Sequence, residues 1–336
     1  MDTTVIVPAR NEEASIERCL TSVLAQDVPD LEVIVIDGAS TDGTLTVVEA
    51  IAGSDHRVRV LHNPHGTIPA SLNMGLMAAH GRWLVRVDAH STVPPGYVRT
   101  LTGHLATGRW GGVGGRKDAE ASTPMGEAIA LALGSPAGVG DSAYHWAQEP
   151  RRTDHVPFGA YPVALLRTLG GWDERLDANE DYEMDLRIRR DGHELLLDPA
   201  VRIRWRSKDS LGALWRQYLR YGRGKADVAR LHPGTLAPRH LAAPAMVAGV
   251  SVAMLIAPFA PAAAALLAAP YPVFVLGAGV WIGVRAGRAS SAPKIAAALA
   301  TMHVAWGLGY WHGRLRPPRS RAGGVAAVQS PAGPVR

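Results

Sequence analysis

Residues 3–88 alternate between two hydrophobic periods, and this alternation constrains the fold more than any other feature of the sequence. Strands are predicted at four near-continuous apolar runs, at residues 3–9, 31–38, 58–63 and 83–88. Apolar residues between these runs recur at helical spacing, as Ile16, Cys19, Leu20, Val23 and Leu24 do. Strands that alternate with helices and are apolar on both faces predict an α/β domain with a mostly parallel sheet covered by helices on both sides.

Polar residues follow three of these predicted strands. The first strand runs into Arg10 and Glu12, the second ends in Asp37, and the fourth ends in Asp88-Ala89-His90. Parallel sheets bind ligands in the crevice outside the carboxyl ends of their strands. Three carboxylate-bearing strand ends at one edge therefore indicate a ligand site.

The chain from residue 111 to 240 gives a less regular pattern. Residues 111–160 are rich in glycine and are predicted to form mobile loops with close backbone approaches. Regular structure is predicted again at residues 181–191, as a helix, at residues 200–205, as a strand, and from residue 210, as a second helix.

The charges are distributed unevenly along the sequence. All 30 Asp and Glu residues precede residue 241, against 27 of the 35 Lys and Arg, so residues 1–240 carry a formal net charge of −3. A mildly acidic body argues against a nucleic-acid partner. The single cysteine, Cys19, excludes an internal disulfide and a cysteine-built zinc site, and its place in an apolar helical pattern predicts a core residue. No signal peptide is expected, because Met1-Asp2 lacks a basic segment, so the main domain should stay in the cytoplasm.

Residues 241–284 contain no charged side chain. This length is roughly twice the ~20 residues that span a bilayer, and prolines cluster at its middle, so a transmembrane helical hairpin is predicted. Arg239 and Arg285 flank it, which places both ends on the cytoplasmic side. A buried, alanine-rich hairpin is the alternative. The weaker segment 295–311 is predicted to lie at the membrane interface or to be re-entrant. The predicted organisation is a main domain at 1–230, a membrane region at 231–312 and a basic, disordered tail at 313–336.

Four motifs resemble those of family 2 glycosyltransferases in order and spacing. They are "VIVPARNEEASIERCLTSVLAQ", "EVIVIDGASTDGT", "GRWLVRVDAH", and "NEDYEMDLRIRR" with "RQYLRYGRGK". The region from GGWDE to QYLRYGR and the apolar tail are most similar to bacterial exopolysaccharide enzymes of the succinoglycan-biosynthesis type. The resemblance implies the GT-A fold, a nucleotide-sugar-binding α/β domain, for residues 3–230.

The resemblance places four residues around the base and ribose of the donor: Pro8, Arg10, Glu12 and Asp37. A carboxylate can accept the imide N–H of uracil or the ribose hydroxyls, so a UDP-sugar is favoured. Ser40 and Asp42 fit the same site or a cap on the following helix equally well.

In this family a strand-end Asp-x-Asp holds a divalent cation against the donor diphosphate. Here Asp88 matches the first acid and His90 replaces the second. Oxygen ligands suit Mg²⁺ and Mn²⁺, and the imidazole shifts the preference toward Mn²⁺. Whether His90 ligates directly, through water, or contacts phosphate stays open.

The remaining site residues follow from the later motifs. Glu180-Asp181 matches the family's Glu-Asp pair, in which the Asp is the general base, although Asp181 would also suit the start of a helix. Gln217, Arg220 and Tyr221 match a Gln-x-x-Arg-Trp motif with Tyr in place of Trp, which implies contact with the diphosphate and the acceptor. Trp172 is predicted to be either a flat platform for the acceptor sugar or a core residue.

The resemblance implies an inverting, metal-dependent hexosyltransferase (EC 2.4) at the cytoplasmic face of the cell membrane. It would transfer sugar from a nucleotide-sugar to a lipid-linked or other saccharide acceptor in exopolysaccharide synthesis. One alternative is a sugar-nucleotide nucleotidyltransferase, but "PARNEE" lacks the expected Gly-rich loop and Lys. The other is a non-catalytic membrane protein that binds nucleotide-sugars.

Overall fold

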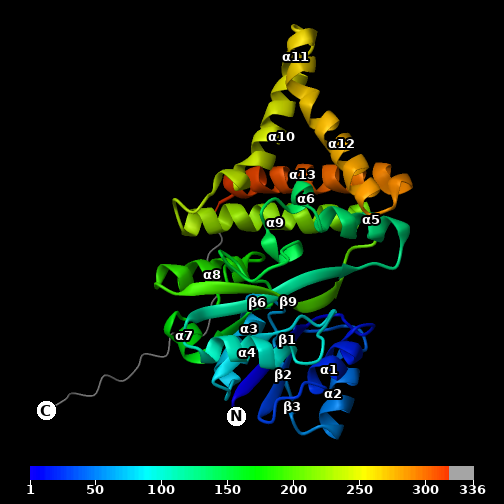
Figure 1. Ribbon diagram of the computed structural model, residues 1–336. Helices are drawn as coiled ribbons and strands as arrows, with labels where there is room; N and C mark the ends of the chain where they lie inside the picture. The colour runs from blue at the N-terminus through cyan, green and yellow to red at the C-terminus, as the bar shows by residue number, and fades with distance from the viewer. Residues whose placement is uncertain (318–336) are drawn as a thin grey trace, which may run out of the picture.

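The computed structural model describes residues 1–317 and has three parts (Figure 1). An α/β body contains the chain's N-terminus, two long helices lie side by side across one end of the body, and a helical hairpin projects beyond them. Only residues 313–317 of the predicted tail are described, and Gly313–Leu315 end the last helix. The rest of that predicted tail lies outside the described residues.

The N-terminal half of the sheet is parallel, as predicted. Its strands are β1 (Thr3–Ala9), β2 (Leu31–Asp37), β3 (Val58–His62) and β4 (Trp83–Arg86), in the order β3-β2-β1-β4. The connecting helices are α1 (Ile16–Leu24), α2 (Thr44–Ser54) and α3 (Ile68–Ala78). Two hydrophobic clusters cover the two faces of the sheet. The predicted core residue Cys19 is completely buried in one of them.

The C-terminal half of the sheet is mixed. It adds β8 (Ala160–Pro162), β6 (Trp110–Glu120), β9 (Glu194–Arg206) and β5 (Ser91–Thr92) in that order, and β7 (Arg151–Thr153) pairs with β9. β6 is parallel to β9 and antiparallel to β8. The shorter helices of the body are α4 (Tyr97–Ala106), α5 (Pro124–Leu133), α6 (Pro136–Val139), α7 (Val163–Thr168) and α8 (Glu180–Arg190).

The glycine-rich segment that was predicted to form loops contains the long strand β6. Its glycines let neighbouring groups approach the strand too closely for any side chain. A Cβ on Gly112 would lie 2.7 Å from the ring of Tyr161, and a Cβ on Gly115 would lie 2.3 Å from the carbonyl oxygen of Val201. Glycine disfavours strands intrinsically, and here close packing overrides that preference.

The two side-by-side helices are α9 (Leu211–Leu231) and α13 (Ala292–Leu315) (Figure 1). Small residues bring their backbones together: a Cβ on Gly222 would lie 2.1 Å from the carbonyl oxygen of Trp306, and one on Gly309 would lie 2.2 Å from that of Leu219. Ile295, Leu299 and Met302 of α13 are completely buried. The segment 295–311 is therefore part of a continuous helix that packs along α9.

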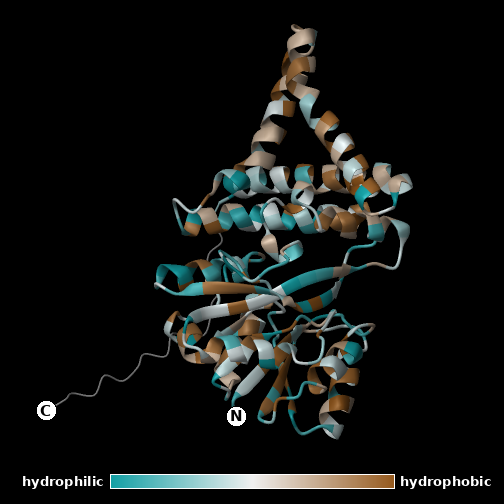
Figure 2. Cartoon of the chain, in the orientation of Figure 1, coloured by the Kyte–Doolittle hydropathy of each residue, from teal (hydrophilic) through white to brown (hydrophobic). Residues whose placement is uncertain are grey.

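The projecting hairpin consists of α10 (Pro238–Ile256), α11 (Pro261–Ala268) and α12 (Pro270–Arg285), and it contains the predicted segment 241–284. Two helical spans, α10 (Pro238–Ile256) and α11 taken together with α12 (Pro261–Arg285), are long and apolar enough to cross a membrane. Only 11% and 17% of their apolar windows are buried inside the protein. Figure 2 shows the hairpin mostly in the brown and pale colours of apolar residues. The alternative of a buried hairpin does not fit this exposure.

Candidate active site

The carboxyl end of β4 carries a buried network of charges. The guanidinium of Arg86 donates from Nε to Asp88 Oδ1 at 2.9 Å and from Nη1 to Glu180 Oε1 at 3.0 Å. Burial alone would lower the pKa of Arg86, but the carboxylates of Asp88 and Glu180 raise it. Arg86 therefore stays charged and ties the end of β4 to the start of α8.

His90 lies beside Glu12 from the loop after β1. Its Nδ1 is 3.3 Å from Glu12 Oε1, and its ring packs edge-on against Trp205 at 6.4 Å. Burial would raise the pKa of Glu12, but hydrogen bonds from His90 and Ser15 lower it overall. The structure thus brings together the polar ends of β1 and β4, as predicted.

The other residues predicted around the donor nucleotide lie at the ends of β1 and β2. Asp37 is 5% exposed and accepts hydrogen bonds from the backbone N–H of Ser40 at 3.3 and 3.4 Å. Arg10 is exposed and donates to the carbonyl oxygen of Gly66 at 3.1 Å, and Pro8 precedes it within β1. Asp42 accepts from the backbone N–H of Thr44, the first residue of α2, at 3.0 Å, and the N-cap of that helix is Gly43.

A cavity of about 690 Å³ lies between the strand ends, α9 and the base of the hairpin. Its walls include most of the predicted catalytic, metal and acceptor residues: Asp88, His90, Glu180, Asp181, Gln217, Arg220 and Tyr221. Pro8, Arg10, Glu12 and Asp37 are not among its lining residues. The predicted nucleotide site is therefore beside this cavity, and the Glu12–His90 contact joins the two.

Asp181 lies in the first turn of α8 and is partly open to the cavity, with its side chain 29% exposed. Its Oδ1 accepts from the backbone N–H of Tyr182 at 2.7 Å, and its Oδ2 is 3.7 Å from His155 Nε2. Burial would raise the pKa of Asp181, but His155, Arg86 and the Tyr182 N–H lower it overall.

The neighbouring Glu180 differs from Asp181 in its exposure and in the direction of its pKa shift. Its side chain is only 6% exposed, and burial together with the charge of Asp181 raises its pKa, although Arg86 opposes the shift. Two adjacent carboxyl groups whose pKa values are shifted in opposite directions indicate different roles. Asp181 is the ionised, accessible group, and Glu180 is a structural partner of Arg86.

The residues of the Gln-x-x-Arg-Tyr segment lie on α9. Gln217 donates from Nε2 to the hydroxyl of Tyr221 at 3.0 Å, and the carbonyl oxygen of Tyr221 accepts from Asn179 Nδ2 at 3.0 Å. The second contact fixes α9 against the loop that precedes Asp181. Arg220 lies on the same helix, with its guanidinium 5.8 Å from the Tyr221 ring.

Trp172 is not an acceptor platform, which corrects one of the two readings of the sequence. It is 3% exposed and belongs to the hydrophobic cluster under α3 and α8, and it does not line the cavity. Its backbone is fixed by Asn73, which accepts from the Trp172 N–H at 2.7 Å and donates to its carbonyl oxygen at 2.9 Å. The ring is a core residue.

Sequence reasoning missed several polar residues of the cavity, among them Lys117, His155 and Lys225. Lys225 had a detectable signal, because it follows Gln217 and Tyr221 at i+8 and i+4 on one helical face. Lys117 lies in β6, which the sequence did not predict. His155 lies in a loop whose position depends on distant parts of the chain.

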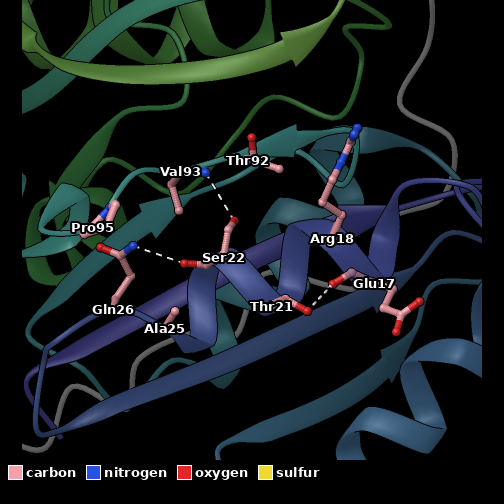
Figure 3. A pocket seen from close by; sticks show the side chains of 9 residues that line it. All are labelled: Glu17, Arg18, Thr21, Ser22, Ala25, Gln26, Thr92, Val93 and Pro95. Atoms are coloured by element: carbon pink, nitrogen blue, oxygen red, sulfur yellow. Dashed lines mark hydrogen bonds between the residues drawn. The ribbon is translucent and has the colours of Figure 1, made fainter.

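A second cavity, of about 500 Å³, lies between α1 and the segment after β5 (Figure 3). Polar side chains there already have partners: Gln26 donates to the carbonyl oxygen of Pro94 at 2.9 Å, and Ser22 accepts from the N–H of Val93 at 3.1 Å. None of the predicted site residues lines it.

The chain is similar to known proteins over most of its length. Residues 4–131 match the model of the family described as "Glycosyl transferase family 2". The succinoglycan biosynthesis protein ExoA of Rhizobium meliloti is 29% identical over 311 residues, which cover 91% of this chain and 93% of that protein. The pre-mycofactocin glycosyltransferase of Mycobacterium tuberculosis is 27% identical over 257 residues, covering 74% of this chain and about half, 52%, of that protein.

Solved structures show the same fold. The mannosyltransferase PcManGT from Pyrobaculum calidifontis, in complex with GDP-Man and Mn²⁺, superposes with a TM-score of 0.60 at 23% identity, covering 89% of this chain and 86% of that chain. GalNAc-T7 with UDP, GalNAc and Mn²⁺ superposes with a TM-score of 0.56 at 16% identity, covering 73% and 51%. The predicted family resemblance and fold class are confirmed. Residues 4–131 are a family 2 glycosyltransferase domain, the body of the chain has the GT-A fold, and the chain is a glycosyltransferase.

Proposed function

We propose that the chain is an inverting, metal-dependent glycosyltransferase that moves a sugar from a nucleotide-sugar, with UDP-sugars favoured, to a lipid-linked saccharide acceptor at the cytoplasmic membrane face. The observation that carries this proposal is that one cavity connects the strand-end pair Asp88 and His90, the carboxylate of Asp181 and the base of the apolar hairpin. In this cavity a donor diphosphate would bind beside Asp88 and His90, an acceptor hydroxyl beside Asp181, and a lipid chain against the base of the hairpin.

Asp88 and His90 are the residues that would hold the cation. No hydrogen bond from residues 1–317 reaches Asp88 Oδ2 or His90 Nε2, and both side chains line the cavity, whereas Asp88 Oδ1 pairs with Arg86 and His90 Nδ1 lies beside Glu12. No group of three or more His, Cys, Asp or Glu residues in the described chain is placed to hold a metal by itself. A cation that also binds diphosphate oxygens and water fits such a two-residue site, as Mg²⁺ and Mn²⁺ do in other phosphate sites.

When bound, the cation would neutralise the charge that develops on the departing nucleoside diphosphate. The Mn²⁺ in both solved relatives supports this assignment.

Asp181 is the proposed general base. A sugar hydroxyl is a weak nucleophile and must lose its proton during attack. The acceptor oxygen would form a bond to the anomeric carbon, the bond from that carbon to the diphosphate oxygen would break, and the proton would pass to Asp181. Attack from the face opposite the leaving group inverts the anomeric configuration. Arg220, on the α9 wall, is the proposed diphosphate contact from this chain.

The acceptor end of the cavity has a cationic side and an apolar side. Lys225 is 6% exposed, and its Nζ lies 3.1 Å from the centroid of the Tyr182 ring, with no carboxylate partner among residues 1–317. Burial lowers the pKa of Lys225 to about 7. The facing wall is apolar and comes from the hairpin and α13, with Met246, Phe274, Met302 and Trp306. An unpaired ammonium beside an apolar wall suits a phosphate attached to a hydrocarbon chain.

Lys225→Gln should raise the acceptor KM by about 10-fold or more, because a hydrogen bond to a charged group contributes about 1.5–3 kcal/mol. The donor KM should change little, because Lys225 lies on the acceptor side of Asp181. Initial rates against acceptor and donor concentration test this, with Lys294→Gln as a control for lost charge at an exposed residue that does not line the cavity. An unchanged acceptor KM would remove Lys225 from the acceptor site.

Membrane association through the hairpin predicts the effect of charges at its tip. Leu255, Phe259 and Leu266 are 73%, 89% and 78% exposed. Replacing all three with Glu should move the protein from the membrane pellet to the soluble fraction, because each charge in a bilayer costs about 2.5–3.5 kcal/mol. The control is Met77→Glu, at a residue of α3 that is 69% exposed on the body. Recovery of the unaltered protein in the soluble fraction without detergent would contradict the membrane assignment.

Transfer of labelled sugar from a UDP-sugar into an organic-solvent extract of membranes tests the function itself. We expect label in the lipid fraction and release of a nucleoside diphosphate. Conversion of the UDP-sugar and added pyrophosphate to UTP and a sugar 1-phosphate would instead indicate a nucleotidyltransferase, and label only in water-soluble saccharide would exclude a lipid-linked acceptor.

A further inference from the structure

His155 stands between two carboxylates of the same helix face. Asp181 and Asp185 are four residues apart on α8, so they lie one turn apart on one side of the helix. The imidazole Nδ1 is 2.7 Å from Asp185 Oδ2, and Nε2 is 3.7 Å from Asp181 Oδ2. One ring nitrogen therefore faces Asp181, the proposed base, and the other contacts the carboxyl group of Asp185.

Asp185 is built to hold this ring. It is completely buried, and besides His155 it accepts from the Val156 N–H at 2.8 Å and from the Tyr161 hydroxyl at 2.9 Å. Burial raises the pKa of Asp185, and the hydrogen bond from His155 opposes that rise. Since Asp185 is an acceptor at Nδ1, the proton on that nitrogen is fixed, and Nε2 is left for Asp181.

Two aromatic rings restrict the imidazole further. Tyr144 packs edge-on at 5.4 Å and Tyr182 at 5.9 Å from the His155 ring. The His155 side chain is 12% exposed, so its orientation does not depend on solvent. Such packing is what a residue needs to hold a catalytic group in place.

We propose that His155 is a positioning residue, which holds the carboxylate of Asp181 in its ionised form and in line with the acceptor hydroxyl. This inference rests on the proposed role of Asp181 as the base. His155 does not touch the reacting atoms and transfers no proton in this scheme.

Other charged side chains also act on His155 and Asp181, and the effect of His155 must be distinguished from theirs. Arg86 from β4 and Lys117 from β6 act on Asp181 in the same direction as His155. Burial would lower the pKa of His155, but the carboxylates of Asp181, Asp185 and Asp154 raise it overall. Among these cations, His155 is the one whose nitrogen lies within 4 Å of an Asp181 oxygen. Its loss should therefore change the ionisation of Asp181, although Arg86 and Lys117 remain.

The test is His155→Asn in the full-length protein. The amide of Asn can take the place of Nδ1 and keep a donor to Asp185, whereas nothing replaces Nε2 beside Asp181. We expect kcat to fall about 10–100-fold, which is the range for a misplaced catalytic group. The donor KM should stay within a factor of about two or three. The acid limb of the pH profile of kcat/KM should move up by about one unit or more, since a nearby opposite charge lowers a carboxyl pKa by 1–3 units.

A matched control comes from a similar pair elsewhere. His104 Nε2 lies 2.8 Å from Asp198 Oδ2, Asp198 is 6% exposed, and neither residue lines the cavity. His104→Asn, the same substitution as in the test variant, removes the ring nitrogen that faces Asp198 and should leave both kcat and the acid limb unchanged. Thermal unfolding of both variants shows whether a lost pair alone explains any loss of activity.

A double variant separates the two proposals. If His155 acts through Asp181, adding His155→Asn to Asp181→Asn should cost no further activity, because residues that act as a unit are not additive. Full activity of Asp181→Asn would overturn the general-base assignment itself. A strongly impaired Asp181→Asn beside a His155→Asn variant with normal kcat and an unchanged acid limb would overturn only the role of His155.

A second pair of variants applies if His155→Asn does not fold. His155→Gln keeps a donor near Nε2 and should therefore retain more activity than His155→Ala. Equal loss of activity in both variants would also contradict the proposal.

Discussion

Replacing Asp181 with Asn should lower kcat by about 10²–10⁴-fold, the usual contribution of a general base. The amide keeps the size and polarity of the carboxylate but cannot accept the proton of the acceptor hydroxyl. The pKa of Asp181 is lowered by His155 and Arg86 against the effect of burial, so the group is ionised at neutral pH in the unaltered protein. Its protonation should therefore reduce activity only below the ordinary titration range of an aspartate.

The substitution should leave the fold nearly intact. The residue before α8 at its N-terminus is Asn179, so Asp181 does not cap the helix. The Oδ1 of Asn can still accept from the Tyr182 N–H, as Asp181 Oδ1 does at 2.7 Å. Loss of a cap would in any case cost only about 0.5–2 kcal/mol of stability. Nucleotide affinity should also persist, because the proposed role of Asp181 is to take the proton of the acceptor hydroxyl and not to bind the diphosphate.

Turnover and nucleotide affinity are the quantities to measure, with Asp191→Asn as the control at the other end of the same helix. Asp191 is exposed and follows α8 at its C-terminus. If Asp181→Asn keeps more than about a tenth of normal turnover, the base lies elsewhere. Glu180 would then be the next candidate, although its buried pairing with Arg86 at 3.0 Å argues against it.

Removal of divalent cations should abolish activity. Arg86 is already paired with Asp88 and Glu180, so its own charge is not free for a diphosphate. We expect exhaustive chelation to reduce turnover to background, and Mn²⁺ to restore it better than Ca²⁺, because a His–Asp site suits a smaller and softer ion. Full turnover after chelation would contradict the metal assignment.

Asp88→Asn should weaken Mn²⁺-dependent nucleotide binding rather than the proton-transfer step. The amide oxygen can still accept from Arg86 Nε, so the buried Arg86 network is preserved, while the free anionic oxygen Oδ2 is lost. Titration of the nucleoside diphosphate with and without Mn²⁺ separates the two effects. The Asp181→Asn variant is the comparison, since it should bind Mn²⁺ and nucleotide normally.

The sequence predicted the N-terminal half of the fold because its signals there are local. Each strand of the parallel half is a continuous apolar run, and each connecting helix has its own periodic face. β6 gave no such signal, because the glycines that make room for Tyr161 and Val201 are the residues that lower strand propensity. The pairing of α13 with α9 depends on Gly222 and Gly309 fitting against distant backbone, which one segment alone cannot reveal.

The candidate site was likewise predictable where it depends on strand ends and not where it depends on packing between distant segments. Carboxylates at strand ends meet at one edge of a parallel sheet whatever the details, so Glu12, Asp88 and His90 were found and lie together. Trp172 was ambiguous because its role depends on whether α3 and α8 cover its ring, and they do. His155 was missed because its partner Asp185 is 30 residues away and only the packing of a loop against α8 joins them.

Release of nucleoside diphosphate from a panel of nucleotide-sugars by the purified full-length protein tests the central claim most directly. The account predicts release from one donor, a UDP-sugar, that requires a divalent cation, stops on chelation and is reduced in Asp88→Asn. Release that is equal with and without cations, release of a nucleoside monophosphate, or no release from any donor in the panel would contradict it.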